Sequence, residues 1–142
     1  MVKPFLAYQD TCSFLLYRTS NPSAVDFQDL QIDGDPLYVH VAKTVKKWEE
    51  FGCCGLVAGA TYPEELRKLR ELMGDQSPFL IPGIGKQGGD VKKTVEYGTN
   101  ADGEMAVINS SRGIIYASDG KDFADAARQK TTSLRELINK YR

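Results

Sequence analysis

The sequence contains a single histidine, His40, and no second histidine or cysteine lies near it at the spacing of metal ligands. A histidine-based metal site and a Ser-His catalytic triad are therefore both excluded, and we interpret His40 as a residue on the surface or flank of a helix. The three cysteines, Cys12, Cys53 and Cys54, include no Cys-x-x-Cys motif. We interpret them as free thiols that serve as small core residues in a reducing compartment.

The sequence also has no excess of positive or negative charge and no long apolar run. The 18 Lys and Arg residues face 19 Asp and Glu residues, which gives a net charge of -1 at pH 7. Nucleic-acid partners favour a basic surplus, and a membrane-spanning helix needs about 20 apolar residues, so neither partner is expected. The N-terminus has no apolar signal segment, and we expect a cytoplasmic protein. With 142 residues, of which 42% are hydrophobic, the chain is predicted to form a single domain, 1–142.

Glycine is concentrated in one stretch, residues 79–90, which reads FLIPGIGKQGGD. A short apolar run suited to a buried strand is followed by four glycines within seven residues and then by Asp90, a good helix N-cap. The backbone N–H groups of such a loop can converge on one anion, and the helix start adds a positive dipole end. The pattern favours a phosphate site. However, the stretch lacks both a P-loop Lys-Ser/Thr pair and a full GxGxxG motif, so alone it could also be an ordinary tight turn.

The rest of the chain alternates between predicted strands and predicted helices. Compact apolar runs predict strands near 14–18, 55–60, 79–83 and 105–109, and periodic apolar patterns predict helices near 37–51, 63–74, 91–97 and 122–141. Such alternation predicts an α/β fold with a parallel sheet, whose sites gather at the C-terminal ends of the strands. The polar or glycine-rich segments 18–20, 60–61, 83–89 and 110–113 all fall at that edge.

Several local expectations accompany this pattern. Residues 1–10 read as the tail of a helix, residues 21–36 as a long loop, and residues 61–64 as a capping box with proline in the first turn. The apolar residues of two helices are expected to face inward: Leu66, Leu69, Leu72 and Met73 in one, and Phe123, Ala126, Ala127, Leu134, Leu137 and Ile138 in the last.

Four strings resemble the second half of orotidine 5'-phosphate decarboxylase in its longer bacterial form: RTSNP (18–22), GLVAGATYP (55–63), IPGIGKQGGD (81–90) and NSSR (109–112). They keep the family's order and spacing over almost the whole chain. The resemblance implies the C-terminal half of a (β/α)₈ TIM barrel with four parallel strands. It also implies a dimer without cofactor or metal that converts orotidine 5'-phosphate to uridine 5'-phosphate and carbon dioxide in pyrimidine biosynthesis.

The resemblance also assigns residues to the substrate. Ser20 would hydrogen-bond the pyrimidine, and Gln87 would bridge from the phosphate toward the base. Arg112 and the backbone of Gly88, Gly89 and Ser111 would hold the phosphate, while Pro82 and Gly83 would line the pocket floor. Outside these strings, Ser20 could equally close a Ser/Thr turn, and Arg112 could be a surface charge.

The family's catalytic Asp-x-Lys-x-x-Asp motif is missing. Asp-x-Lys occurs at 90–92 and at 119–121, but Val95 and Ala124 stand where the final Asp is needed. We expect the chain to begin after the family's fourth strand and to carry no catalytic residue. On its own it is then not expected to decarboxylate.

A half-barrel exposes two sheet edges and an apolar inner face, which something should cover. The cover could be a second copy or a separate N-terminal half, or the chain could be a truncated product. Three functions stay open from the sequence: part of the decarboxylase, a catalytically silent nucleotide- or phosphate-binding module, or another phosphate-binding barrel such as a pentulose-phosphate epimerase.

Overall fold

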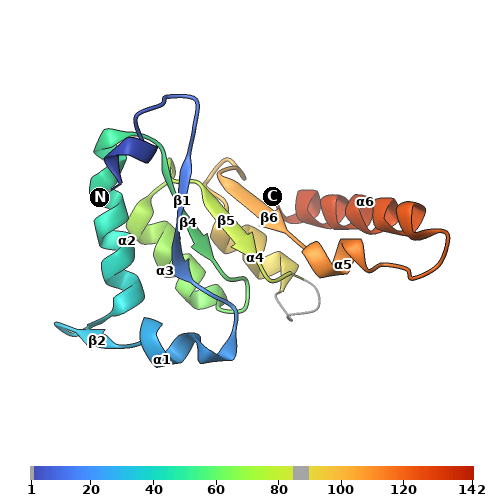
Figure 1. The fold of residues 1–142 in the computed structure, drawn as a ribbon, viewed down its shortest axis with the longest axis horizontal. Coiled ribbons are helices and arrows are strands. Elements are labelled where there is room, and N and C mark those ends of the chain that lie inside the picture. Colours follow the sequence, from blue (N-terminus) through green and yellow to red (C-terminus); the bar gives the residue numbers. More distant parts are fainter. Residues whose placement is uncertain (1, 85–89) are drawn as a thin grey trace.

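The structure is a computed structural model that describes residues 2–84 and 90–142. Four parallel strands form its sheet: β1 (Ser13–Arg18), β4 (Cys54–Ala58), β5 (Phe79–Pro82) and β6 (Ala106–Asn109). Their order across the sheet is β1-β4-β5-β6, so each strand pairs with the next large strand of the chain (Figure 1). The predicted parallel α/β arrangement is confirmed.

Helices connect the strands and cover one face of the sheet. α2 (Leu37–Trp48) packs on β1 and β4 and continues into a 3-10 turn, η3 (Glu49–Phe51). α3 (Pro63–Met73) lies between α2 and α4 (Val91–Gly98), and α5 (Ser111–Ile115) follows β6 (Figure 1). The core lies between these helices and the sheet, and its fully buried side chains include Val45, Leu56, Leu66, Leu69, Met73, Phe79, Ile81 and Val95.

Local sequence signals account for one end each of α3 and α4. The Asp90 carboxylate accepts a hydrogen bond from the Lys93 backbone N–H at 3.2 Å, as its predicted N-cap role requires. α3 ends at Gly74, whose φ of 77° suits glycine. The predicted capping box is wrong: Pro63 occupies the first helical position, which makes Tyr62 the N-cap and leaves Thr61 one residue too early.

Residues 21–36 are not the long loop that we expected. They form a 3-10 turn, η2 (Pro22–Ala24), a short helix, α1 (Val25–Gln28), and a hairpin of β2 (Gln31–Ile32) and β3 (Asp35–Pro36). Asp33 and Gly34 turn the hairpin with positive φ angles of 50° and 87°. His40, on the flank of α2, binds this hairpin, because its Nε2 lies 2.7 Å from the Ile32 carbonyl oxygen.

The two ends of the chain also differ from expectation. Residues 1–10 contain one 3-10 turn, η1 (Lys3–Phe5), in place of a helix tail. The last helix, α6 (Phe123–Tyr141), has no fully buried residue, so its predicted inward face is only partly confirmed. Ala126, Ala127, Leu134 and Ile138 are partly buried, and Leu134 packs against the core, whereas Phe123 and Leu137 are exposed. The reason is that α6 contacts α4 and α5 and extends past the β6 edge of the sheet (Figure 1). Two further apolar residues that we expected inside, Leu72 and Cys53, are exposed, whereas Cys54 is buried.

The sheet is open at both edges within the described part of the chain. β1 pairs there only with β4, and β6 only with β5. Apolar side chains on these edge strands are exposed, with Leu16 at 56% and Val107 at 55%. In the same described residues, no helix is long and apolar enough to cross a bilayer.

Candidate functional site

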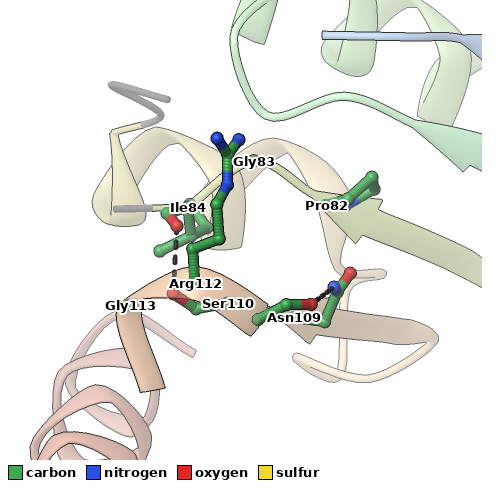
Figure 2. Close-up of a pocket in the computed structure, with 8 residues that line it drawn as sticks. Pro82, Gly83, Ile84, Asn109, Ser110, Arg112 and Gly113 are labelled. Carbon is green, nitrogen blue, oxygen red and sulfur yellow. Dashed lines mark hydrogen bonds between the residues drawn. The ribbon is translucent and has the colours of Figure 1, made fainter. Parts of the chain in front are cut away.

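A cavity of about 170 Å³ lies where the loops after β5 and β6 meet (Figure 2). β5 and β6 are parallel neighbours in the sheet, so their C-terminal ends place these loops side by side. Four of the residues predicted from the sequence line the cavity: Pro82, Gly83, Ser111 and Arg112. The other lining residues are Ile84, Asn109, Ser110 and Gly113.

Backbone geometry and two polar contacts shape the cavity. Gly83 has a φ of 106°, a conformation that side chains disfavour, and it turns the chain away from β5. The Ser110 hydroxyl donates a hydrogen bond to the Ile84 carbonyl at 3.0 Å, which ties the two loops together (Figure 2). The Asn109 side-chain amide donates to the Ser111 hydroxyl at 3.3 Å. These two hydrogen bonds fix the walls of the cavity without the help of a ligand.

Arg112 supplies the positive charge of the site. Its side chain extends from α5 toward the loop that follows β5 (Figure 2). Within the described residues, no hydrogen bond or ion pair joins its guanidinium to the protein. A guanidinium in that position can bind a planar or tetrahedral anion through several N–H donors.

Ser20, the predicted pyrimidine contact, lies at the same edge of the sheet but outside this cavity. It follows β1, so β4 and β5 separate its strand from β6. The end of β4 approaches it closely: a Cβ added to Gly59 would lie 3.0 Å from the Ser20 backbone nitrogen. The structure thus brings Ser20 next to the end of β4 and leaves the ends of β4 and β5 between it and Arg112.

The residue before Ser20 is fixed by α1. The Gln28 side chain accepts a hydrogen bond from the Thr19 backbone N–H and donates one to the Thr19 hydroxyl, each at 3.0 Å. The segment that we predicted to be a loop therefore braces the end of β1.

We did not predict from the sequence the cluster of acidic and aromatic side chains around one buried arginine, Arg18, close to Ser20. Arg18 is 3% exposed, forms an ion pair with Asp29, and places its Nε 3.0 Å from a carboxylate oxygen of Glu65. The rings of Tyr38 and Tyr62 lie 5.1 and 4.5 Å from its guanidinium carbon.

Two features of this cluster follow from its position. Burial raises the pKa of the Glu65 carboxyl, and the charge of Arg18 opposes that shift.

The strand register shifts between Leu16 and Arg18, which turns Arg18 toward the helices. A charged residue that directly ends an apolar run was the one sequence signal of this cluster.

The remaining predicted residues, Gln87, Gly88 and Gly89, fall in residues 85–89 and lie outside the described residues. Residues 2–84 and 90–142 contain no group of three or more His, Cys, Asp or Glu side chains that could hold a metal ion.

The sequence matches one family of known proteins over most of its length. Residues 1–127 match the family model described as orotidine 5'-phosphate decarboxylase / HUMPS family. The chain belongs to this family.

Curated relatives in the family are close in sequence. The orotidine 5'-phosphate decarboxylase of Cupriavidus necator is 52% identical over 142 residues, which cover 99% of this chain and 52% of the relative. That of Cellvibrio japonicus is 51% identical over 97% of this chain and 50% of the relative. The chain spans about half the length of the curated relatives that it matches.

Solved structures of the family agree with the fold. The structure of Leishmania donovani UMP synthase matches 99% of this chain and 30% of its own, with a TM-score of 0.82 and 38% identity. Leishmania donovani OMP decarboxylase matches 97% of this chain and 52% of its own, with a TM-score of 0.77 and 32% identity. These matches do not favour the alternative of a pentulose-phosphate epimerase.

Proposed function

We propose that this chain is the phosphate- and pyrimidine-binding half of an orotidine 5'-phosphate decarboxylase. The observation that supports this most is the position of Arg112, whose guanidinium extends over a cavity of about 170 Å³ between the loops after β5 and β6. In (β/α)₈ barrels the loops after the last two strands often form a phosphate site. The ligand is then orotidine 5'-phosphate or uridine 5'-phosphate.

Each predicted residue has a place in this proposal. Arg112 pairs with the phosphate oxygens, and Ser111, Gly88 and Gly89 donate backbone N–H groups to them. Pro82 and Gly83 form the floor, Gln87 reaches from the phosphate toward the base, and Ser20 hydrogen-bonds the pyrimidine. Phosphate contacts far from the reacting carbon supply binding energy that an enzyme can use in the transition state.

Decarboxylation needs groups that this chain does not supply. Both Asp-x-Lys triplets lack the final Asp, since Val95 and Ala124 occupy its place. We therefore propose that turnover requires a complementary N-terminal half, whose strands cover the open edges of β1 and β6. A homodimer of this chain is the second way to cover the same edges. The three free cysteines suit the reducing cytoplasm, where we place the protein.

Calorimetric titration of the purified chain with uridine 5'-phosphate tests the binding part. We expect Arg112→Ala to weaken binding at least about tenfold, because a charge-assisted bidentate contact is lost. Arg128→Ala, which removes an exposed arginine of α6, is the matched control and should leave the affinity unchanged. Uridine without its phosphate should bind wild type and Arg112→Ala alike. Equal affinities of the two proteins for the nucleotide would refute the assigned phosphate site.

Ultraviolet-monitored consumption of orotidine 5'-phosphate tests the catalytic part. We expect no turnover from the chain alone, and turnover after mixing with the N-terminal half of a relative such as the Cupriavidus necator enzyme. Turnover by the chain alone would show that another Lys/Asp set acts here. Nucleotide binding without turnover in the mixture would favour a catalytically silent binding module.

A further inference from the structure

Cys12 and Cys53 lie opposite each other where β1 and β4 begin, at the end of the sheet away from the cavity. Ser13 pairs with Cys54 in the parallel register, and the Ser13 N–H donates to the Cys53 carbonyl at 3.0 Å. Cys12 and Cys53 each precede this pair by one residue, so they face each other just before the two strands begin.

The register places the two side chains next to each other. Residues directly opposite in a parallel pair project to the same side, and neighbouring strands lie about 4.8 Å apart. Burial, together with the neighbouring Cys53 thiol, raises the pKa of Cys12 to about 12. Cys53 is exposed and Cys12 is partly exposed, whereas Cys54, the first residue of β4, is 1% exposed.

We propose that Cys12 and Cys53 are an oxidisable dithiol, which forms a reversible disulfide when a small-molecule disulfide such as oxidised glutathione is the oxidant. The spacing of adjacent strands falls within the Cα separation of about 4.4–6.8 Å that disulfides adopt. The site is independent of the proposed nucleotide site, which lies at the opposite ends of the strands.

The exchange proceeds in two balanced steps. The exposed Cys53 thiol loses its proton to solvent, and the thiolate attacks one sulfur of the oxidant, which releases one glutathione thiolate and leaves a mixed disulfide. Cys12 then loses its proton and attacks the Cys53 sulfur, which releases the second glutathione. Two cysteine thiols are oxidised, and one glutathione disulfide is reduced to two thiols. Cys53 attacks first because it is accessible and because the raised pKa of Cys12 keeps that residue a thiol.

The bond would hold the edge of the sheet. β1 has β4 as its only strand partner among the described residues. A link between Cys12 and Cys53 closes a loop that contains α1, the β2–β3 hairpin and α2, which restrains the unfolded chain. We expect the oxidised protein to resist unfolding better and to bind uridine 5'-phosphate with the affinity of the reduced protein.

Disulfide mapping by mass spectrometry tests the proposal. The folded protein is incubated with oxidised glutathione, its remaining thiols are alkylated in denaturant, and its peptides are analysed. We expect one linked pair that joins Cys12 to Cys53, with Cys54 alkylated. Cys54→Ala should retain the link, whereas Cys12→Ser should stop at a mixed disulfide of Cys53 with glutathione, and Cys53→Ser should form neither.

The same reaction in concentrated urea separates native geometry from random pairing. The link should close at least about tenfold faster in the folded protein, because the strands hold the thiols together. This comparison uses the wild-type chain and so does not depend on how the serine variants fold. A Cys53–Cys54 link, a disulfide between two chains, or a mixed disulfide that persists in the folded wild type would each overturn the proposal.

Discussion

The guanidinium carbon of Arg70 lies 3.8 Å from the centre of the Phe79 ring. From this position the side chain donates hydrogen bonds to the carbonyl oxygens of four residues: Gly74, Ser77, Gly98 and Met105. Gly74 and Gly98 end two helices, and the other two residues precede β5 and β6. Burial lowers the pKa of Arg70 to about 10, which leaves it charged at neutral pH. One arginine of α3 thus joins two successive strand–helix units.

Arg70→Met should lower the free energy of unfolding by about 3 kcal/mol, because buried carbonyls lose a charged donor. The urea midpoint measures the change, with an unchanged m-value as the sign that only stability is altered. Arg67→Met is the matched control, since Arg67 lies on the same helix and pairs at the surface with Glu64 and Glu71. Its cost should stay below about 1 kcal/mol. Similar losses in both variants would contradict the role assigned to Arg70.

Two glycines next to the core should respond differently to alanine. A Cβ on Gly55 would lie 2.5 Å from the Pro78 carbonyl oxygen, whereas one on Gly98 would lie 2.4 Å from the Cδ1 methyl of Ile81. We expect Gly55→Ala to cost about 2–3 kcal/mol, because a paired backbone oxygen cannot move aside. Gly98→Ala should cost less than about 1 kcal/mol, because a terminal methyl can shift and alanine favours the helix. Thermal denaturation of both variants decides the order.

The partly buried carboxyl of Glu65 should give a pH-dependent difference in stability. Its pKa in the folded protein is raised above 4.5, its ordinary value, so the folded state binds the proton more tightly. Its contribution to the free energy of unfolding is therefore largest below that value and falls as the pH rises through the raised pKa.

Glu65→Gln should accordingly gain stability relative to wild type as the pH rises from below 4.5 through the raised pKa of Glu65. Urea unfolding at a series of pH values measures this difference. Glu64→Gln, which removes the neighbouring surface carboxylate, controls for the loss of one negative charge. A difference that stays constant with pH in Glu65→Gln would contradict the raised pKa.

Gln28→Ala should weaken the binding of uridine 5'-phosphate about three- to tenfold while leaving inorganic phosphate binding unchanged. The variant loses both hydrogen bonds that fix Thr19, next to the proposed pyrimidine contact Ser20. A three- to tenfold loss corresponds to about 1 kcal/mol, the net worth of one such bond. Gln31→Ala is a suitable control, because the exposed Gln31 side chain bonds only the Asp29 carbonyl among the described residues. Equal losses for both ligands would indicate a general loss of structure.

Local signals in the sequence predicted well where the partner is a near neighbour. Asp90 caps the helix that it precedes, and Gly74 ends the helix before it. The rule that sites gather at strand ends, together with the four matched strings, placed Pro82, Gly83, Ser111 and Arg112 around one cavity. The hairpin at Asp33-Gly34 was missed, although an Asp-Gly pair between short extended segments is a known hairpin signal.

Features that depend on distant partners could not be predicted. Arg18 is buried only because Asp29, Glu65 and two tyrosines from other elements surround it. The periodicity of the last helix shows that one side is apolar, but not how completely other elements cover that side, which is only partly buried. The same holds for the cysteines: composition indicates free thiols, and only the register of β1 and β4 places Cys12 opposite Cys53.

The strand order has a consequence for how the chain folds during synthesis. Because each large strand pairs with the one made just before it, every new strand–helix unit can dock as soon as it leaves the ribosome. Among the described residues no strand needs a partner beyond its neighbouring strand–helix unit, which limits the loop-closure entropy. The nascent sheet exposes two edges, β1 and the strand made most recently, and each can pair with another chain until a further strand covers it.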